Sequence, residues 1–159
     1  MARELIVAWT GKRRPAWEAL CEDYASRIDK MSSVREVLVR PGTGPDGVRI
    51  AREGQALLAA LPDPSLIVAL DRRGKTLSSP QLAEKLGHWN ETWPHPIVFA
   101  LGSDLGLSRE VLEAAELRLS LGALTLPHEL ARLVVYEQLY RALAIQRGIK
   151  YHRVPLDGH

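Results

Sequence analysis

Short runs of apolar residues recur along the chain and predict the strands of a buried sheet. The runs cover residues 5–9, 34–39, 66–70 and 97–101, and three of these four are continuous rather than alternating in hydrophobicity. A continuous apolar run is typical of a strand that is buried on both faces. We therefore expect a parallel sheet that is covered on both sides.

The segments between these runs carry apolar residues at helical spacing. This spacing predicts helices over residues 17–28, 48–61 and 82–89, and a long closing helix over about residues 127–147. Alternating strands and helices form right-handed crossovers, which place helices on both faces of a parallel sheet. The sequence therefore predicts a doubly wound α/β fold.

Length and composition indicate one globular domain over residues 1–159. Of the 159 residues 46% are hydrophobic and 25% are charged, which is typical of a single packed core. Residues 40–47 are rich in glycine and proline. We interpret them as a surface connection rather than a domain boundary, because the pieces on either side are too small to fold alone.

Charge, cysteine content and apolar run length exclude several classes of protein. The formal net charge is only +2, so any surface that binds nucleic acid must be local. The single cysteine, Cys21, excludes an internal disulfide, and the spacing of His88 and His95 matches no familiar zinc pattern. The apolar runs are too short for a membrane span. We expect a cytoplasmic protein that binds neither a metal ion nor a membrane.

Three loops that follow strands are candidates for a binding site, because ligands of open α/β sheets bind beyond the carboxyl ends of the strands. They cover residues 69–75, 101–108 and 119–127. The second loop is rich in glycine and ends at a helix N-cap, Ser108, although its G-S-D-L-G spacing is no dinucleotide signature. The third is apolar and rich in small residues, which suits a planar ligand such as adenine.

Three motifs in the C-terminal part carry a specific resemblance. They are L-G-A-L-T-L-P-H-E-L-A-R at residues 121–132, E-Q-L-Y-R-A at residues 137–142 and Y-H-R at residues 151–153. Together they closely resemble the RlmH family, the ribosomal RNA large-subunit methyltransferase H group of the SPOUT (α/β-knot) methyltransferases. The resemblance covers nearly the whole chain, including the W-T-G-K turn at residues 9–12.

This resemblance implies a fold, a reaction and partners. The implied fold is a parallel sheet flanked by helices with a C-terminal trefoil knot, roughly over residues 66–150, and a tail over residues 151–159. The implied enzyme is a homodimer that uses S-adenosylmethionine to methylate N3 of a pseudouridine in helix 69 of 23S rRNA, on assembled ribosomes. General topology rules alone argue against a knot, because threaded chains are rare.

The resemblance also assigns cofactor-binding residues to the three loops. These residues are Leu70, Gly102, Leu121, Gly122, Ala123, Leu124, Thr125 and Leu126. Taken singly, each leucine is more simply explained as ordinary core. The chain departs from the family twice: Ser103 stands where a second glycine is common, and the chain continues through residues 154–159 where relatives usually end soon after the Tyr-His pair.

Tyr151, His152 and Arg153 are the candidate catalytic residues. They follow Gly148, a candidate helix cap, so their charges have no helix dipole to balance. Methyl transfer to an imide nitrogen needs alignment, a base for the N3 proton and a cation near the flanking carbonyl oxygens. We assign His152 as the base, Arg153 as the cation and Tyr151 as the residue that positions the base. Because it lies outside the sheet, this tail can reach the cofactor pocket of a second subunit.

Several alternatives stay open at the level of sequence. Glu137 pairs either with Arg141, four residues further on, or together with Arg132 meets groups across a two-fold interface. His128 either contacts the cofactor loop or is hydrogen-bonded locally. The main functional alternative is a non-catalytic ribosome-binding or cofactor-sensing module, which Ser103 in place of glycine would favour. An unrelated enzyme on a generic doubly wound sheet is what composition alone would permit.

Overall fold

Five strands form one sheet in which every neighbouring pair runs parallel. The computed structural model describes residues 3–153. The strands follow the order β2-β1-β4-β3-β5, with bounds β1 (Leu5–Thr10), β2 (Val34–Val39), β3 (Leu66–Thr76), β4 (Ile97–Leu101) and β5 (Leu117–Ser120). Every residue of β1 and β4 is buried. The continuous apolar runs in the sequence therefore reflect burial on both faces, as expected.

The sequence pattern locates four of the five strands and misses β5. Strand β5 has only four residues, and Arg118 interrupts its apolar positions, so no run is visible there. Strand β3 also extends past residue 70, where its apolar run ends, to Thr76. Residues 71–74 leave the ladder with β5, and the pairing resumes with Lys75 opposite Leu119. This excursion projects polar residues beyond the carboxyl edge of the sheet.

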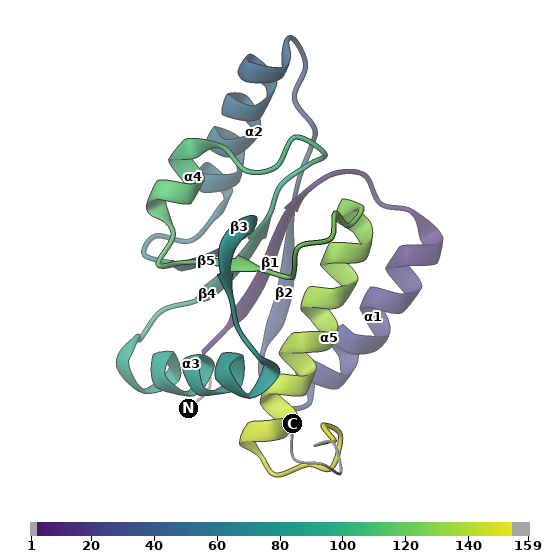
Figure 1. Cartoon of the computed structure of the whole chain (residues 1–159), viewed down its shortest axis with the longest axis vertical. Coiled ribbons are helices and arrows are strands. Elements are labelled where there is room, and N and C mark those ends of the chain that lie inside the picture. The colour runs from purple at the N-terminus through teal and green to yellow at the C-terminus, as the bar shows by residue number, and fades with distance from the viewer. Residues whose placement is uncertain (1–2, 154–159) are drawn as a thin grey trace.

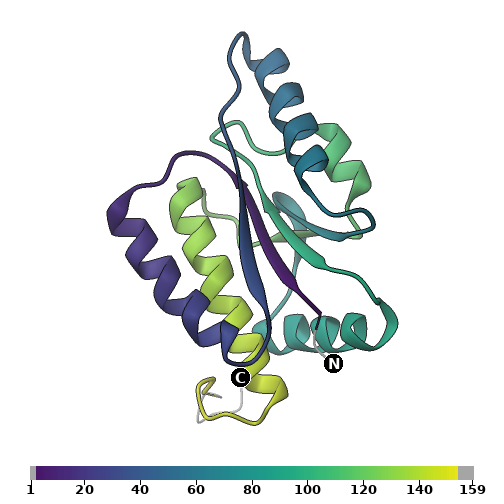
Figure 2. The same ribbon diagram turned by 180° about the vertical axis from the view of Figure 1, so that it is seen from behind.

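Helices cover both faces of the sheet. They are α1 (Pro15–Asp29), α2 (Asp46–Ala60), α3 (Ser79–Thr92), α4 (Arg109–Ala114) and α5 (His128–Gln146). Helices α1, α3 and α5 pack over one core, and α2 and α4 pack over a second core on the opposite face. Figure 1 shows α1 beside α5, and Figure 2 shows α2 and α4 grouped away from that pair. The predicted α/β fold with helices on both faces is confirmed.

The predicted connections agree with this architecture. Ser108 is the N-cap of α4, and its Oγ accepts a hydrogen bond from the backbone N–H of Val111 at 3.3 Å. Residues 40–45 connect β2 to α2, residues 46–47 already belong to α2, and strands from both sides of this connection belong to the same sheet. Within residues 3–153, no helix has the length and apolar character that crossing a bilayer requires.

The close packing of α2 on α4 gives a test of the fold. A Cβ atom at Gly54 of α2 would lie 2.0 Å from Oγ and 2.7 Å from Cβ of Ser108. We expect Gly54→Ala to lower the free energy of unfolding by about 1–3 kcal/mol, because the two helices must separate. Gly47→Ala in the same helix meets no atom within 4 Å and serves as the matched control in urea denaturation. Equal stability of the two variants would contradict this packing.

Candidate functional site

The excursion of β3 over residues 71–74 and the loops that follow β4 and β5 meet at the carboxyl edge of the sheet and enclose a cavity. Its volume is about 430 Å³, and its wall also includes His128 and Ala131 from the start of α5. Small-molecule sites usually measure roughly 300–1,000 Å³. The chain leaves β5 past the other two loops and enters α5 on the face opposite α4.

The loop after β4 folds closely onto itself around Gly102. A Cβ atom there would lie 2.3 Å from the carbonyl oxygen of Gly106 and 2.7 Å from the backbone nitrogen of Leu107. The turn that brings them together uses a φ of +81° at Gly106, a conformation that favours glycine. Among the described residues positive φ occurs only at glycine, so Ser103 adds no backbone strain of this kind.

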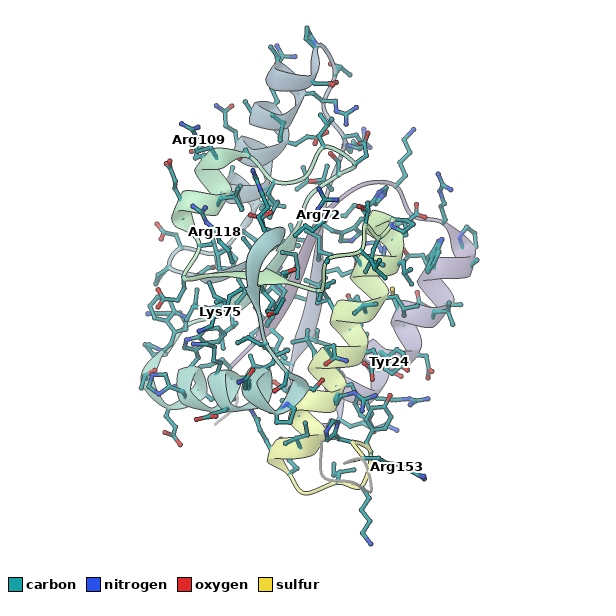
Figure 3. The ribbon with its side chains drawn as sticks, in the orientation of Figure 1. Tyr24, Arg72, Lys75, Arg109, Arg118 and Arg153 are labelled. Atoms are coloured by element: carbon teal, nitrogen blue, oxygen red, sulfur yellow. The ribbon has the colours of Figure 1, made fainter. Side chains whose placement is uncertain are left out.

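The loop after β5 offers apolar surface at the rim of the cavity. Leu124 is 82% exposed, and it lines the cavity together with Leu121 and Leu126. The loop turns at Gly122, whose φ is +132°. Its Thr125 Oγ1 accepts a hydrogen bond from Nη1 of Arg72 at 2.6 Å. This bond connects the excursion of β3 to the loop after β5. Arg72 is labelled in Figure 3.

Most of the residues assigned to the cofactor by resemblance line this cavity. They are Leu70, Gly102, Leu121, Gly122, Leu124, Thr125 and Leu126, whereas Ala123 does not contribute to the wall. Leucines from separate loops suit a flat apolar ring system. The wall also contains Asp71, Arg72 and Asp104, which suit a ligand with charged ends.

The sequence does not single out these three charged residues. Their loops are candidates because they follow strands, but no spacing within them selects Asp71, Arg72 or Asp104. Their one signal in the sequence is a place just after an apolar run that predicts a buried strand. His128 lies in the wall, which favours its contact with the cofactor loops over a purely local role.

A buried charge network fixes α5 against α1 and the sheet. Arg132 is 1% exposed, its Nη2 donates to Oε1 of Glu18 at 2.6 Å, and its guanidinium lies 4.1 Å from the centre of the Trp9 ring. Glu36 of β2 accepts hydrogen bonds from Trp9 Nε1 and, at 2.8 Å, from the hydroxyl of Tyr136. Arg132 therefore pairs within its own chain, and the cavity end of α5 is held in place.

Known proteins match this chain over nearly its full length. The family profile described as "Predicted SPOUT methyltransferase" matches residues 3–152. Proteins named ribosomal RNA large subunit methyltransferase H are similar as well. The one from Maridesulfovibrio salexigens is 36% identical over 95% of this chain and 99% of its own length. The one from Dinoroseobacter shibae is 43% identical over 85% of this chain and 88% of its own length.

The chain belongs to the RlmH family of SPOUT methyltransferases. The resemblance found in the sequence motifs is thereby confirmed. Two solved structures share the fold of this RlmH chain. A probable methylase family protein from Haemophilus influenzae has a TM-score of 0.54 at 15% identity and covers 94% of this chain and 70% of its own. A probable methyltransferase from Bordetella pertussis has a TM-score of 0.52 at 18% identity, with coverage of 89% and 96%.

The Y-H-R motif of this RlmH chain lies at the far end of α5 from the cavity. The hydroxyl of Tyr151 donates to Oε1 of Glu137 at 3.2 Å, and Nη1 of Arg141 donates to Nδ1 of His152 at 3.1 Å. Helix α5 has 19 residues and is therefore about 28 Å long. Figure 3 shows Arg153 at one end of it and Arg72 near the other. One chain does not bring the two groups of candidate residues together.

Glu137 holds the tail through the pair that the helical spacing predicts. Its Oε1 accepts from Nε of Arg141, four residues further on, at 2.9 Å. Tyr24 of α1, which the sequence does not mark, places its hydroxyl 3.5 Å from that of Tyr151. Burial, this contact with Tyr24 and the charge of Glu137 raise the pKa of the Tyr151 phenol. Tyr151 therefore stays protonated at neutral pH, which fits a positioning role better than that of a base.

The ion pairs of Glu18 predict a dependence of stability on pH. Burial acts to raise the pKa of its carboxyl, but hydrogen bonds and charges of Arg132 and Arg13 outweigh it and lower the pKa below the ordinary 4.5. A lowered pKa contributes stability that is present above the unfolded-state value and is lost as pH falls through the folded-state value. We expect Glu18→Gln to be less stable than the unmodified protein at pH 7.

This deficit should shrink as pH falls below about 4.5, because the unmodified protein then loses the same contribution. Urea unfolding at a series of pH values measures it. Glu22→Gln is the control, since Glu22 is exposed on the same helix and forms no ion pair with residues 3–153. A deficit that is constant down to pH 3 would contradict the role of the Glu18 charge.

Proposed function

We propose that this protein transfers a methyl group from S-adenosylmethionine to N3 of a pseudouridine in 23S rRNA. The observation that carries the proposal is the cavity at the carboxyl edge, lined by the residues that the family motifs assign to the cofactor. The relatives are named for methylation of the large-subunit RNA. We infer that the target lies in helix 69 of assembled ribosomes, and that the protein acts in the cytoplasm.

The cavity would hold the cofactor through its leucines and its charged rim. Leu70 of β3 and Leu121 and Leu126 of the loop after β5 offer apolar surface, and Asp71 and Asp104 add carboxylates to the wall. An apolar enclosure with few polar groups is typical of sites that bind a nucleoside. When bound, S-adenosylmethionine supplies an electrophilic methyl group on a sulfonium. The chain itself must align the acceptor and remove one proton.

The tail would supply the proton chemistry. In this assignment His152 accepts the N3 proton, Arg153 places a positive charge near the flanking carbonyl oxygens and Tyr151 orients the histidine. In the single chain Arg141 donates to Nδ1 of His152, since a guanidinium only donates. That nitrogen becomes free to accept a proton only when the tail leaves this contact.

A homodimer would resolve the separation between cavity and tail. In the single chain Tyr151 and His152 bond to Glu137 and Arg141, about 14 Å and about 20 Å along α5 from His128, and neither lines the cavity. A two-fold partner can present its tail to the cavity, which makes two composite sites in each dimer. The non-catalytic alternative loses its argument from sequence, because Ser103 adopts no left-handed backbone conformation.

Analysis of rRNA tests the proposed reaction and substrate together. We expect 23S rRNA from cells without this gene to lack N3-methylpseudouridine in helix 69, and the gene on a plasmid to restore it. Mass spectrometry of digested rRNA measures the nucleoside and its position. A modification that persists without the gene, or the loss of a different modified nucleotide, would overturn the proposal.

Deletion of residues 151–159 should separate binding from turnover. We expect the affinity for S-adenosylmethionine to stay largely intact while methyl transfer falls by roughly 10²-fold or more, the usual scale for losing acid–base and charge-stabilising groups. Calorimetry and incorporation of labelled methyl groups measure the two quantities. Full activity of the shortened protein would remove His152 and Arg153 from the mechanism.

Mixed dimers should show whether the tail acts on the second subunit. A subunit without its tail is combined with a subunit carrying Gly122→Val, which strains the loop at a φ of +132°. We expect partial recovery of activity, because one site of each mixed dimer then has an intact cavity and an intact tail. Sedimentation must first show dimers. A particle of about 17.7 kDa at micromolar concentration, or no recovery in proven mixed dimers, would contradict the composite site.

A further inference from the structure

A buried carboxylate on α2 has no role in the reaction described above. Glu53 is only 4% exposed, and it does not line the cavity. A buried carboxylate is costly unless hydrogen bonds and opposite charge compensate for the lost hydration. The partners of Glu53 therefore show what its presence achieves.

These partners connect three separate segments of the chain. Oε1 of Glu53 accepts a hydrogen bond from Oγ of Ser103 at 2.6 Å, and Oε2 accepts one from the backbone N–H of Gly42 at 2.8 Å. Arg49, one turn earlier on α2, lies 3.5 Å from Oε2 and donates through Nη2 to Oδ1 of Asp104 at 2.6 Å. We call the Glu53–Ser103 bond and the Arg49–Asp104 pair together the α2 clamp.

The α2 clamp holds the loop that forms one wall of the cavity. Ser103, Asp104, Leu105 and Gly106 all line the cavity. Within the loop, Oγ of Ser103 also accepts a hydrogen bond from the backbone N–H of Leu105 at 3.3 Å. The backbone carbonyl oxygen of Ser103 accepts one from the N–H of Gly106 at 2.9 Å. The hydroxyl of Ser103 is therefore the point where the internal bonds of the loop meet the anchor on α2.

We propose that Glu53 is a positioning residue for the cofactor, acting through the hydroxyl of Ser103 to hold the cavity loop in its binding conformation. The identity of the ligand rests on the proposed function. A loop that is already ordered loses less conformational entropy when a ligand binds, so pre-ordering increases affinity. Removing the anchor should weaken binding of the cofactor more than it changes the rate at saturating cofactor.

Ser103→Ala is the decisive variant, because it removes the bond while leaving Glu53 with its other partners. We expect the dissociation constant for S-adenosylhomocysteine to rise about tenfold, the equivalent of ~1.4 kcal/mol, and kcat to change little. In the ligand-free protein, backbone amides of residues 103–107 should exchange hydrogen faster. Ser103→Thr keeps the hydroxyl and should restore both quantities, and Ser103→Ala should add little in a Glu53→Ala background, which lacks the acceptor.

Ser32→Ala is the matched control. Ser32 is a buried serine whose hydroxyl donates to the carbonyl oxygen of Arg3 at 3.1 Å, outside the cavity wall. It should reduce stability without changing affinity. The proposal is overturned if Ser103→Ala lowers only the free energy of unfolding and leaves both affinity and loop exchange unchanged. If the unmodified protein binds no S-adenosylhomocysteine, the proposed function fails, and hydrogen exchange still decides whether the α2 clamp orders the loop.

Discussion

The length and rigidity of α5 determine how far the C-terminal motif lies from the cavity. Its first turn forms part of the cavity wall, and the tail with Tyr151 and His152 follows its last turn. These two ends lie about 28 Å apart. The tail folds back along the helix and bonds to Glu137 and Arg141, about 14 Å and about 20 Å along the axis from His128. In a single chain the cavity and the candidate catalytic residues therefore lie apart. In a dimer with a two-fold axis, the tail of each copy would lie beside the cavity of the other copy.

Buried side chains keep α5 in this position. Arg132 connects the helix to Glu18 of α1 and to the face of Trp9 in β1, while Tyr136 donates to Glu36 of β2. The bonds among these side chains join four elements close to the carboxyl edge of the sheet. On the opposite face, the α2 clamp connects α2 to the loop after β4. Contacts from both helical layers therefore hold the cavity in place. The bonds of Arg132 and Tyr136 fix the wall that α5 forms, and the α2 clamp fixes the wall that contains Gly102.

The apolar pattern predicts most of the fold because burial on both faces leaves a clear signal. Strands β1 to β4 and the long helices follow from it, whereas β5 escapes because Arg118 lies within its four residues. The motifs identify the family, and most of the residues assigned to the cofactor by resemblance line the cavity. They do not reveal Arg72, Asp104 or the anchoring of Ser103, because those contacts join residues far apart in the sequence. The bond from Glu53 to Ser103 spans 50 positions.

The position of the tail in the sequence likewise does not determine its position in the folded protein. A short motif after a helix can fold back toward the sheet, stay at the helix end or reach another chain. The structure shows Tyr151 packed on Tyr140, with ring centres 4.7 Å apart, at the end of its own helix. In this position the motif lies outside the cavity of its own chain, and the proposed composite site therefore takes its tail from a second chain.

A crystal structure of the protein with S-adenosylhomocysteine tests this account most directly. The account predicts the ligand in the cavity between the excursion of β3 and the loops that follow β4 and β5. It also predicts the Tyr151–His152 segment of a second copy beside the ligand and the contact between Arg141 and His152 broken. A ligand bound elsewhere on the chain would contradict it. So would a ligand in the cavity of a monomer, or of a dimer in which each tail stays on its own α5.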